Sequence, residues 1–324
     1  MMTETGMRRV YSLVVVAAAL ALAAGCSSSS SSGGGGLSAE ESAALAVFAG
    51  PGAAESAQES LPDGDTFDIG DTGSGAGAGM GIMASDCSES GTQVEGDGSQ
   101  GVFGGPVTTE TLSFSNYTVT CPGGAQASVD GRIETGEDGS GRFYGEFGNP
   151  GAEDGPFVAS VQGDAVPPMA FDMSALVKVC EACGGSDDGG YSVGGNPDLQ
   201  AEFYMNAVID LGELSGHFRF GQTPSDPMVF RIWSPGANET ITLDGRMGVD
   251  QSGSPCGFDW VLDTVNPIVF QDDEPWNGHV VATDPNDGSS TYDVVVSSGQ
   301  ITVNGEPISE ARQDEISELC AFDD

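Results

Sequence analysis

Short hydrophobic runs alternate with turn residues over most of the chain. From about residue 102 onward, runs rich in Thr, Val, Ile, Phe and Tyr are separated by Gly, Asp, Asn and Pro, as in "TLSFSNYTVTC" (111–121) and "PMVFRIW" (227–233). Runs of about four to eight such residues are typical of antiparallel strands. The pattern predicts a mainly β body over 102–324, an antiparallel meander that forms a sandwich or a barrel-like body. Whether this body divides into two subdomains, 102–180 and 198–324, stays open.

A short helix is expected ahead of the β body. The segment "LSAEESAALAVFA" (37–49) is rich in alanine, the best helix former, and Ser38 and Glu41 have the spacing of a capping box. Beyond it, Gly, Asp and Ser predominate up to residue 101 without a periodic hydrophobic pattern. We therefore expect 37–101 to be this helix followed by largely irregular chain.

A second short helix is expected at the end of the chain, from Ser309 to Leu319. It would turn Ile316 and Leu319 towards the sheet and present Cys320 for pairing. The fold class is thus mainly β, with a short N-terminal helix and a short C-terminal helix.

Three segments of the β body resemble one another. They are "SVDGRI" (128–133), "TLDGRM" (242–247) and "TVNGEP" (302–307), each with an apolar pair, Asp or Asn, and then Gly. The Asp/Asn-Gly step suits a type I′ turn or a bulge, where positive φ is needed. The intervals between the segments are irregular, so recurrent hairpin chemistry explains them at least as well as duplication does.

The N-terminal region carries an export signal. An apolar run from Val10 to Ala24 follows Arg8 and Arg9. At about 15 residues it is shorter than the roughly 20 that a membrane-spanning helix needs. A basic start, a short apolar run and small residues at its end predict a secretory signal peptide over 1–25.

The end of this run is more specific. "LAAGC" (22–26) resembles the lipobox of bacterial lipoproteins, although Ala23 stands where Leu is usual. The resemblance implies cleavage before Cys26 and attachment of fatty-acyl chains such as palmitate to Cys26, and Ser27 favours the outer membrane. Residues 26–36 are Ser and Gly after the cysteine, a composition typical of a flexible tether. An ordinary signal peptide with a chance cysteine is the alternative.

The charge is strongly negative. The chain has 49 Asp and Glu against 9 Lys and Arg, a net charge of −40. Nucleic-acid binding needs a basic footprint, so no nucleic-acid partner is expected. The acidic residues indicate either a surface adapted to salty surroundings or cation binding by clustered carboxylates.

The seven cysteines agree with export. With Cys26 assigned to lipid, an even number remains, which in an oxidising compartment predicts three disulfides. Spacing alone allows many pairings; we favour Cys87–Cys121, Cys180–Cys183 and Cys256–Cys320. The "CEAC" segment at 180–183 could instead be a redox motif, and a zinc site would need a second such pair.

Candidate sites for small ligands are few. A weak calcium site is conceivable at the turn "DPNDGSSTYD", with Asp284, Asn286, Asp287 and Asp293 as oxygen ligands, although Asp and Asn also favour turns for backbone reasons. No other cofactor is expected. The two histidines, His217 and His279, fall in expected strands and are interpreted as structural.

One further family likeness concerns the β body. "GRFYGEFGNPGAEDGPFVAS" (141–160) and "AVIDLGELSGHF" (207–218) are similar to segments of transferrin-binding-type surface lipoproteins. The likeness implies a ligand-binding barrel. The residues that would line its pocket are Phe143, Tyr144, Phe218, Phe220 and Trp233.

Together these observations predict a non-catalytic, exported lipoprotein of the bacterial envelope. It would be anchored through Cys26 in the outer membrane, facing the periplasm or the cell surface, and would act as an interaction or structural module with an unidentified envelope or extracellular partner. A ligand-binding barrel or sandwich is the alternative, and a hydrolase the third hypothesis.

Overall fold

A computed structural model of the chain describes residues 37–47, 88–120, 124–150, 155–163, 166–181, 197–210, 215–233, 238–251, 256–271 and 274–319. The predicted signal peptide, Cys26 and the tether at 26–36 lie outside these residues.

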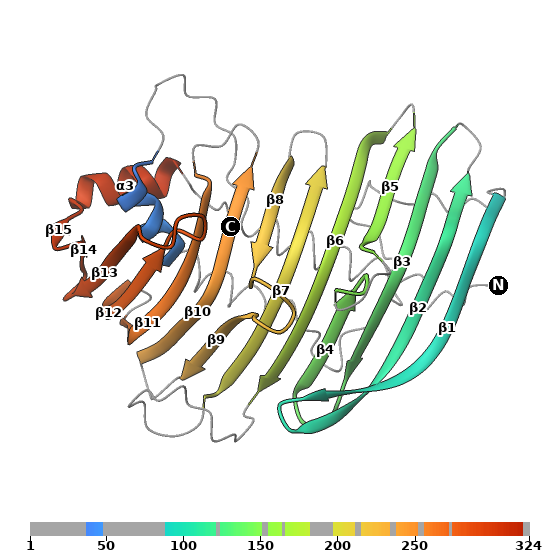
Figure 1. Cartoon of the computed structure of the whole chain (residues 1–324), viewed down its shortest axis with the longest axis horizontal. Helices are drawn as coiled ribbons and strands as arrows, with labels where there is room; N and C mark the ends of the chain where they lie inside the picture. The colour runs from blue at the N-terminus through green and yellow to red at the C-terminus, as the bar shows by residue number, and fades with distance from the viewer. Residues whose placement is uncertain are drawn as a thin grey trace, which may run out of the picture.

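The described strands form one 15-stranded sheet in which all strand pairs are antiparallel (Figure 1). The strands are β1 (Ser88–Val102), β2 (Gly105–Thr120), β3 (Gln126–Glu137), β4 (Arg142–Phe147), β5 (Phe157–Gly163), β6 (Val166–Glu181), β7 (Leu199–Asp210), β8 (Ser215–Phe220), β9 (Met228–Trp233), β10 (Asn238–Gln251), β11 (Phe258–Gln271), β12 (Glu274–Thr283), β13 (Thr291–Ser297), β14 (Gln300–Val303) and β15 (Glu306–Pro307). The predicted mainly β, antiparallel class is confirmed. Among the described strands β1 and β15 each have one neighbour, so the strands lie in an open series, a simpler arrangement than the sandwich or barrel-like body that we expected.

Both predicted helices are present. Residues 39–47 are helical, and the capping box is formed: the Ser38 backbone N–H donates to Glu41 Oε2 at 2.8 Å and the Glu41 N–H donates to Ser38 Oγ at 3.2 Å. The helix α3 (Glu310–Leu319) ends the described chain, with Ile316 buried. Neither these nor any other helix of the described residues combines the length and apolar character needed to cross a bilayer.

The sheet begins earlier than the sequence predicted. The β body was expected from residue 102, with irregular chain before it, but β1 starts at Ser88 and pairs with β2 from Ser88↔Thr120 to Val102↔Gly105. The prediction was wrong for 88–101 because β1 lies at the edge of the sheet, with most of its side chains exposed. A strand that buries neither face has no need of alternating apolar residues.

The two conceivable subdomains are one continuous sheet. The strands β6 and β7 lie on either side of 182–196 and pair over the whole of β7, from Ala170↔Asp210 to Glu181↔Leu199. Outward from the β6–β7 pair, the strand order is the same in both directions: a long strand, two short collinear strands, and another long strand. We call β3, β4, β5 and β6 the first unit, and β7, β8, β9 and β10 the second unit.

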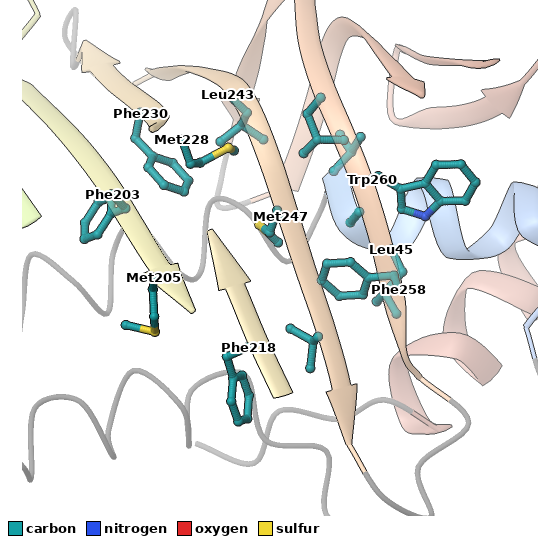
Figure 2. Close-up of a cluster of buried hydrophobic side chains, with 14 of the residues drawn as sticks. Leu45, Phe203, Met205, Phe218, Met228, Phe230, Leu243, Met247, Phe258 and Trp260 are labelled. Atoms are coloured by element: carbon teal, nitrogen blue, oxygen red, sulfur yellow. The ribbon is translucent and has the colours of Figure 1, made fainter. Parts of the chain in front are cut away.

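The main core covers one face of the sheet and extends through both units. Figure 2 shows its central part, where Phe203, Phe218, Phe230 and Met247 belong to one cluster of buried side chains. Leu45 of the N-terminal helix belongs to the same cluster. The other face of the sheet, which we call the polar face, carries most of the charged side chains discussed below.

Candidate functional site: the β1–β2 arm and the charges beneath it

The hairpin of β1 and β2, which we call the arm, is the longest two-stranded element at the edge of the sheet. Its turn consists of Phe103 and Gly104, with φ of 43° and 81°. Two consecutive residues with positive φ are typical of a type I′ turn, whose twist matches that of the flanking strands. The arm can therefore continue to its tip as a regular, twisted ladder.

The tip of the arm folds across the polar face of the first unit. Val102 and Val107 are fully buried and form a small second cluster with Tyr144 of β4. Figure 1 shows the turn end of the arm sweeping past β3 towards β4. The approach requires a glycine in β3, because a Cβ at Gly136 would lie 2.1 Å from the backbone oxygen of Thr108.

A buried carboxylate lies beneath the arm. Glu134 of β3 is 1 % exposed, and it accepts hydrogen bonds from two arm residues, from Gln100 Nε2 at 2.9 Å and from Thr109 Oγ1 at 2.5 Å. The Arg132 guanidinium also contacts Glu134 and reaches Glu146 at 3.1 Å. Because a buried charge is costly unless it is paired and hydrogen-bonded, these donors are what make Glu134 tolerable at this position.

The network extends to the phenol of the tip cluster. Tyr144 donates its hydroxyl proton to Glu146 Oε2 at 2.6 Å. Burial, followed by the hydrogen bond and the charge of Glu146, raises the pKa of Tyr144 well above its usual value. The phenol therefore stays protonated at physiological pH and keeps its role as donor. Gln100 and Thr109 tie the arm directly to Glu134, while Arg132 and Tyr144 hold Glu134 and Glu146 from below, so the arrangement acts as a clamp on the arm.

The outer side of the arm is an open sheet edge. Among the described strands β1 pairs with β2 alone, over 15 residues. Its exposed side chains include Val94, at 62 %, and the acids Glu95 and Asp97. The opposite end of the sheet is different, because β15 has two residues, one of them Pro307, and is followed by α3. Short strands and proline are common ways to protect an edge, and β1 has neither; its protection is limited to exposed acids and the register shift between Ser90 and Thr92.

The polar face of the second unit has a different set of charges. Asp259 of β11 receives two hydrogen bonds of 2.8 Å from Arg246 and lies 3.2 Å from Arg219. Arg219 in turn lies 3.2 Å from Nδ1 of His217, whose Nε2 is 2.6 Å from Asn206. Burial and the nearby Arg219 guanidinium lower the pKa of His217. These contacts link four neighbouring strands across the sheet.

The five aromatic pocket candidates do not all lie in one cluster. Phe143 and Tyr144 are neighbours on β4 and therefore point to opposite faces: Phe143 packs against the main core and Tyr144 lies in the tip cluster. Phe218 and Phe220 belong to the main core, and Trp233 is buried outside both clusters. The alternation of strand side chains thus separates residues that are close in sequence.

The acids of the expected calcium turn are used in hydrogen bonds. Asp287 accepts from the backbone and the hydroxyl groups of Ser289 and Ser290, which holds its pKa well below the usual range. Asp284 accepts from the Asn286 N–H at 2.7 Å, and Asp293 lies 2.9 Å from His279 Nε2. No three described Asp, Glu, His or Cys residues cluster so as to hold a metal ion. These contacts favour the explanation from turn chemistry.

The cysteines are described only in part. Cys180 and Cys256 are buried and disulfide-bonded. The other cysteines lie outside the described residues; they are Cys26, Cys87, Cys121, Cys183 and Cys320. The pairing scheme and the lipid on Cys26 stay predictions.

The sequence does not reveal the clamp, because nothing in "IETGE" (133–137) marks Glu134 as buried. Its burial depends on the arm, which begins in a segment that we expected to be irregular. The only hint was the alternation itself, since Ile133 faces the main core and Glu134 must then face the other way.

No protein-family model, no curated protein and no solved structure matches the chain.

Proposed function

We propose that this chain is a lipid-anchored envelope protein that works without catalysis, as an interaction module that presents the open edge of its sheet. The observation that carries the proposal is the contrast between the two edges. Among the described strands the sheet ends at one side in the two-residue β15, whereas at the other side the 15-residue β1 pairs with β2 alone. A long edge strand can recruit a further strand, so the length of β1 supports a role in binding.

The clamp supports the same function. An edge strand at the end of a freely moving hairpin would lose conformational entropy on binding. Glu134 and the tip cluster hold the arm in place, which keeps β1 ordered before any partner arrives. The predicted signal peptide and lipobox supply the anchor, and the acidic composition keeps the exposed sheet soluble.

The anchor is tested by metabolic labelling with an alkyne fatty acid in intact bacteria. We expect label on the wild-type chain, recovery with the outer membrane, and loss of both in Cys26→Ser. An unlabelled wild-type chain in the soluble fraction would contradict the proposal.

The role of the edge is tested in the same cells with a photo-crosslinking residue at Val94. The matched control is Val208, which is 51 % exposed but lies on β7 in the middle of the sheet. We expect a discrete envelope adduct from position 94 that is absent from position 208. Equal crosslinking from both positions would argue against a role for the edge.

A further inference from the structure

We infer that β1 accepts an extended segment of its partner as an additional antiparallel strand, and that this segment carries Lys or Arg at alternate positions. The inference rests on the proposed function and names the chemistry of the partner.

The backbone provides the general affinity. An edge strand presents a row of N–H and C=O groups, and strand addition satisfies them in pairs with a second extended chain. The accessible part is the stretch from Ser88 to Asp97, because beyond it Gln100 and Val102 are turned into the clamp and the tip cluster. The register shifts between Ser90 and Thr92, so the regular part of this stretch runs from Thr92 to Asp97, a ladder of roughly 20 Å at about 3.4 Å per residue.

Charge selects the occupant. Glu95 and Asp97 are two residues apart on one strand and therefore project from the same face, about 7 Å from each other. Both side chains are exposed. Basic side chains at alternate positions of an added strand would lie beside these acids and pair with them.

The same charges argue against a second copy of this chain. A copy that paired through its own β1 would bring Glu89, Glu95 and Asp97 of both chains to one seam. The net charge of −40 would add long-range repulsion between the copies. A basic segment from another molecule avoids both costs.

The test uses the full chain in detergent and a synthetic peptide in which Lys alternates with Val or Thr. We expect binding by calorimetric titration, slower amide exchange over 88–97, and weaker binding at high salt, because exposed charges are screened. Two further peptides separate backbone from charge: one with alternate N-methylated residues, which cannot complete the ladder, and one with Glu in place of Lys. Neither is expected to bind.

Matched protein variants complete the design. Glu95→Gln/Asp97→Asn is expected to weaken binding of the Lys peptide about tenfold. The control Asp263→Asn/Glu306→Gln removes two exposed acids elsewhere on the sheet and is expected to bind as the wild type does.

Three outcomes would overturn the inference: equal binding of the N-methylated peptide, equal binding by the two protein variants, or concentration-dependent dimerisation that protects β1. If the Lys peptide fails but the position-94 adduct persists in cells, the partner chemistry is wrong and the proposed function stands.

Discussion

The first and second units share one local backbone arrangement. In both, a long strand carries Asp-Gly-Arg at the point where its neighbour breaks into two short strands. Gly131 and Gly245 have φ of 111° and 123°, and the carbonyl oxygens of Arg132 and Arg246 each accept a 2.8 Å hydrogen bond from a glycine N–H at the break. The registers agree as well, with Ile133↔Phe147 in one unit and Met247↔Phe220 in the other.

The aspartates of the two motifs also have the same role. Asp130 accepts from the N–H of Asn116 at 2.9 Å, and Asp244 accepts from the N–H of Thr264 at 3.0 Å. Both donors lie at irregularities of the neighbouring long strand. The Asp-Gly-Arg sequence therefore closes a bulge on one side and makes room for the strand break on the other.

The units differ in the side chains that lie over this backbone arrangement on the polar face. Where the first unit has Glu134, buried under the arm, the second has Gly248 at the equivalent register and an open row of charges around Asp259. The backbone arrangement is therefore common to both units, whereas the polar face forms a clamp in the first unit and an exposed charged surface in the second.

The largest effect is expected from the two glycines. Gly131→Ala and Gly245→Ala place a Cβ 2.9 and 2.8 Å from backbone atoms of Phe157 and Met228, at φ values that Ala avoids. Each change should lower the free energy of unfolding by about 2–4 kcal/mol, measured by urea denaturation. Gly101→Ala, which meets no atom within 4 Å, is the control. If only one of the two substitutions lowers the free energy of unfolding, the two units are not equivalent.

Glu134→Ala should distinguish the units most clearly. It removes the acceptor of Gln100, Thr109 and Arg132, and we expect a loss of about 2–3 kcal/mol together with faster amide exchange in the arm. Beside the second unit, Asp259→Ala on β11 should cost about 1 kcal/mol, because its partners Arg219 and Arg246 are partly exposed, and leave arm exchange unchanged. If amide exchange in the arm is unchanged in Glu134→Ala, Glu134 does not hold the arm in place.

Beyond the second unit, acid should loosen the contact between the two helices. Arg312 donates to Glu41 from Nε at 2.5 Å and from Nη2 at 2.9 Å, and these hydrogen bonds lower the pKa of Glu41 from 4.5 to about 2. Because the folded-state pKa is the lower one, the stabilisation is complete above pH 4.5 and is lost as the pH falls towards 2.

Glu41→Gln tests this contact while keeping a capping-box side chain. We expect it to be about 1–2 kcal/mol less stable than the wild type at pH 7, with the difference closing near pH 2, as followed by thermal unfolding across the pH range. A difference that does not depend on pH would show that the pair contributes through packing and not through charge.

The smallest effect is expected from the two aspartates. Asp130→Ala and Asp244→Ala each leave a backbone N–H of the neighbouring strand without its acceptor, at a cost of about 1 kcal/mol in urea denaturation. Asp→Asn at the same positions keeps a carbonyl oxygen in place and should restore most of the loss. Failure of Asn to restore stability at one site would show that its charge matters there.

The sequence predicted those elements whose signal is local. The capping box of Ser38 and Glu41, the C-terminal helix and the antiparallel strands follow from short patterns. The turn at Asn304 and Gly305, with φ of 51° and 82°, agrees with the type I′ turn that the Asn-Gly step indicated.

The elements that the sequence did not reveal depend on distant partners. The "SVDGRI" and "TLDGRM" segments are similar in sequence, but their glycines lie inside long strands, next to a pair of short strands. No short sequence pattern indicates that position. The strand β1 and the burial of Glu134 have the same explanation, because each is defined by the arm folding back on a face that lies more than 20 residues further along the chain.

The order of the strands has a consequence for the route by which the chain folds. Most strand pairs join neighbours in sequence, so the sheet can grow by local hairpins as the polypeptide emerges, a topology that favours rapid folding. The Glu41–Arg312 contact spans 271 residues and cannot form until α3 has been made. The N-terminal helix also accepts a hydrogen bond from Trp260 Nε1 of β11 at Ser42 Oγ, 3.1 Å away, so it can dock on the sheet first and be fastened to α3 afterwards.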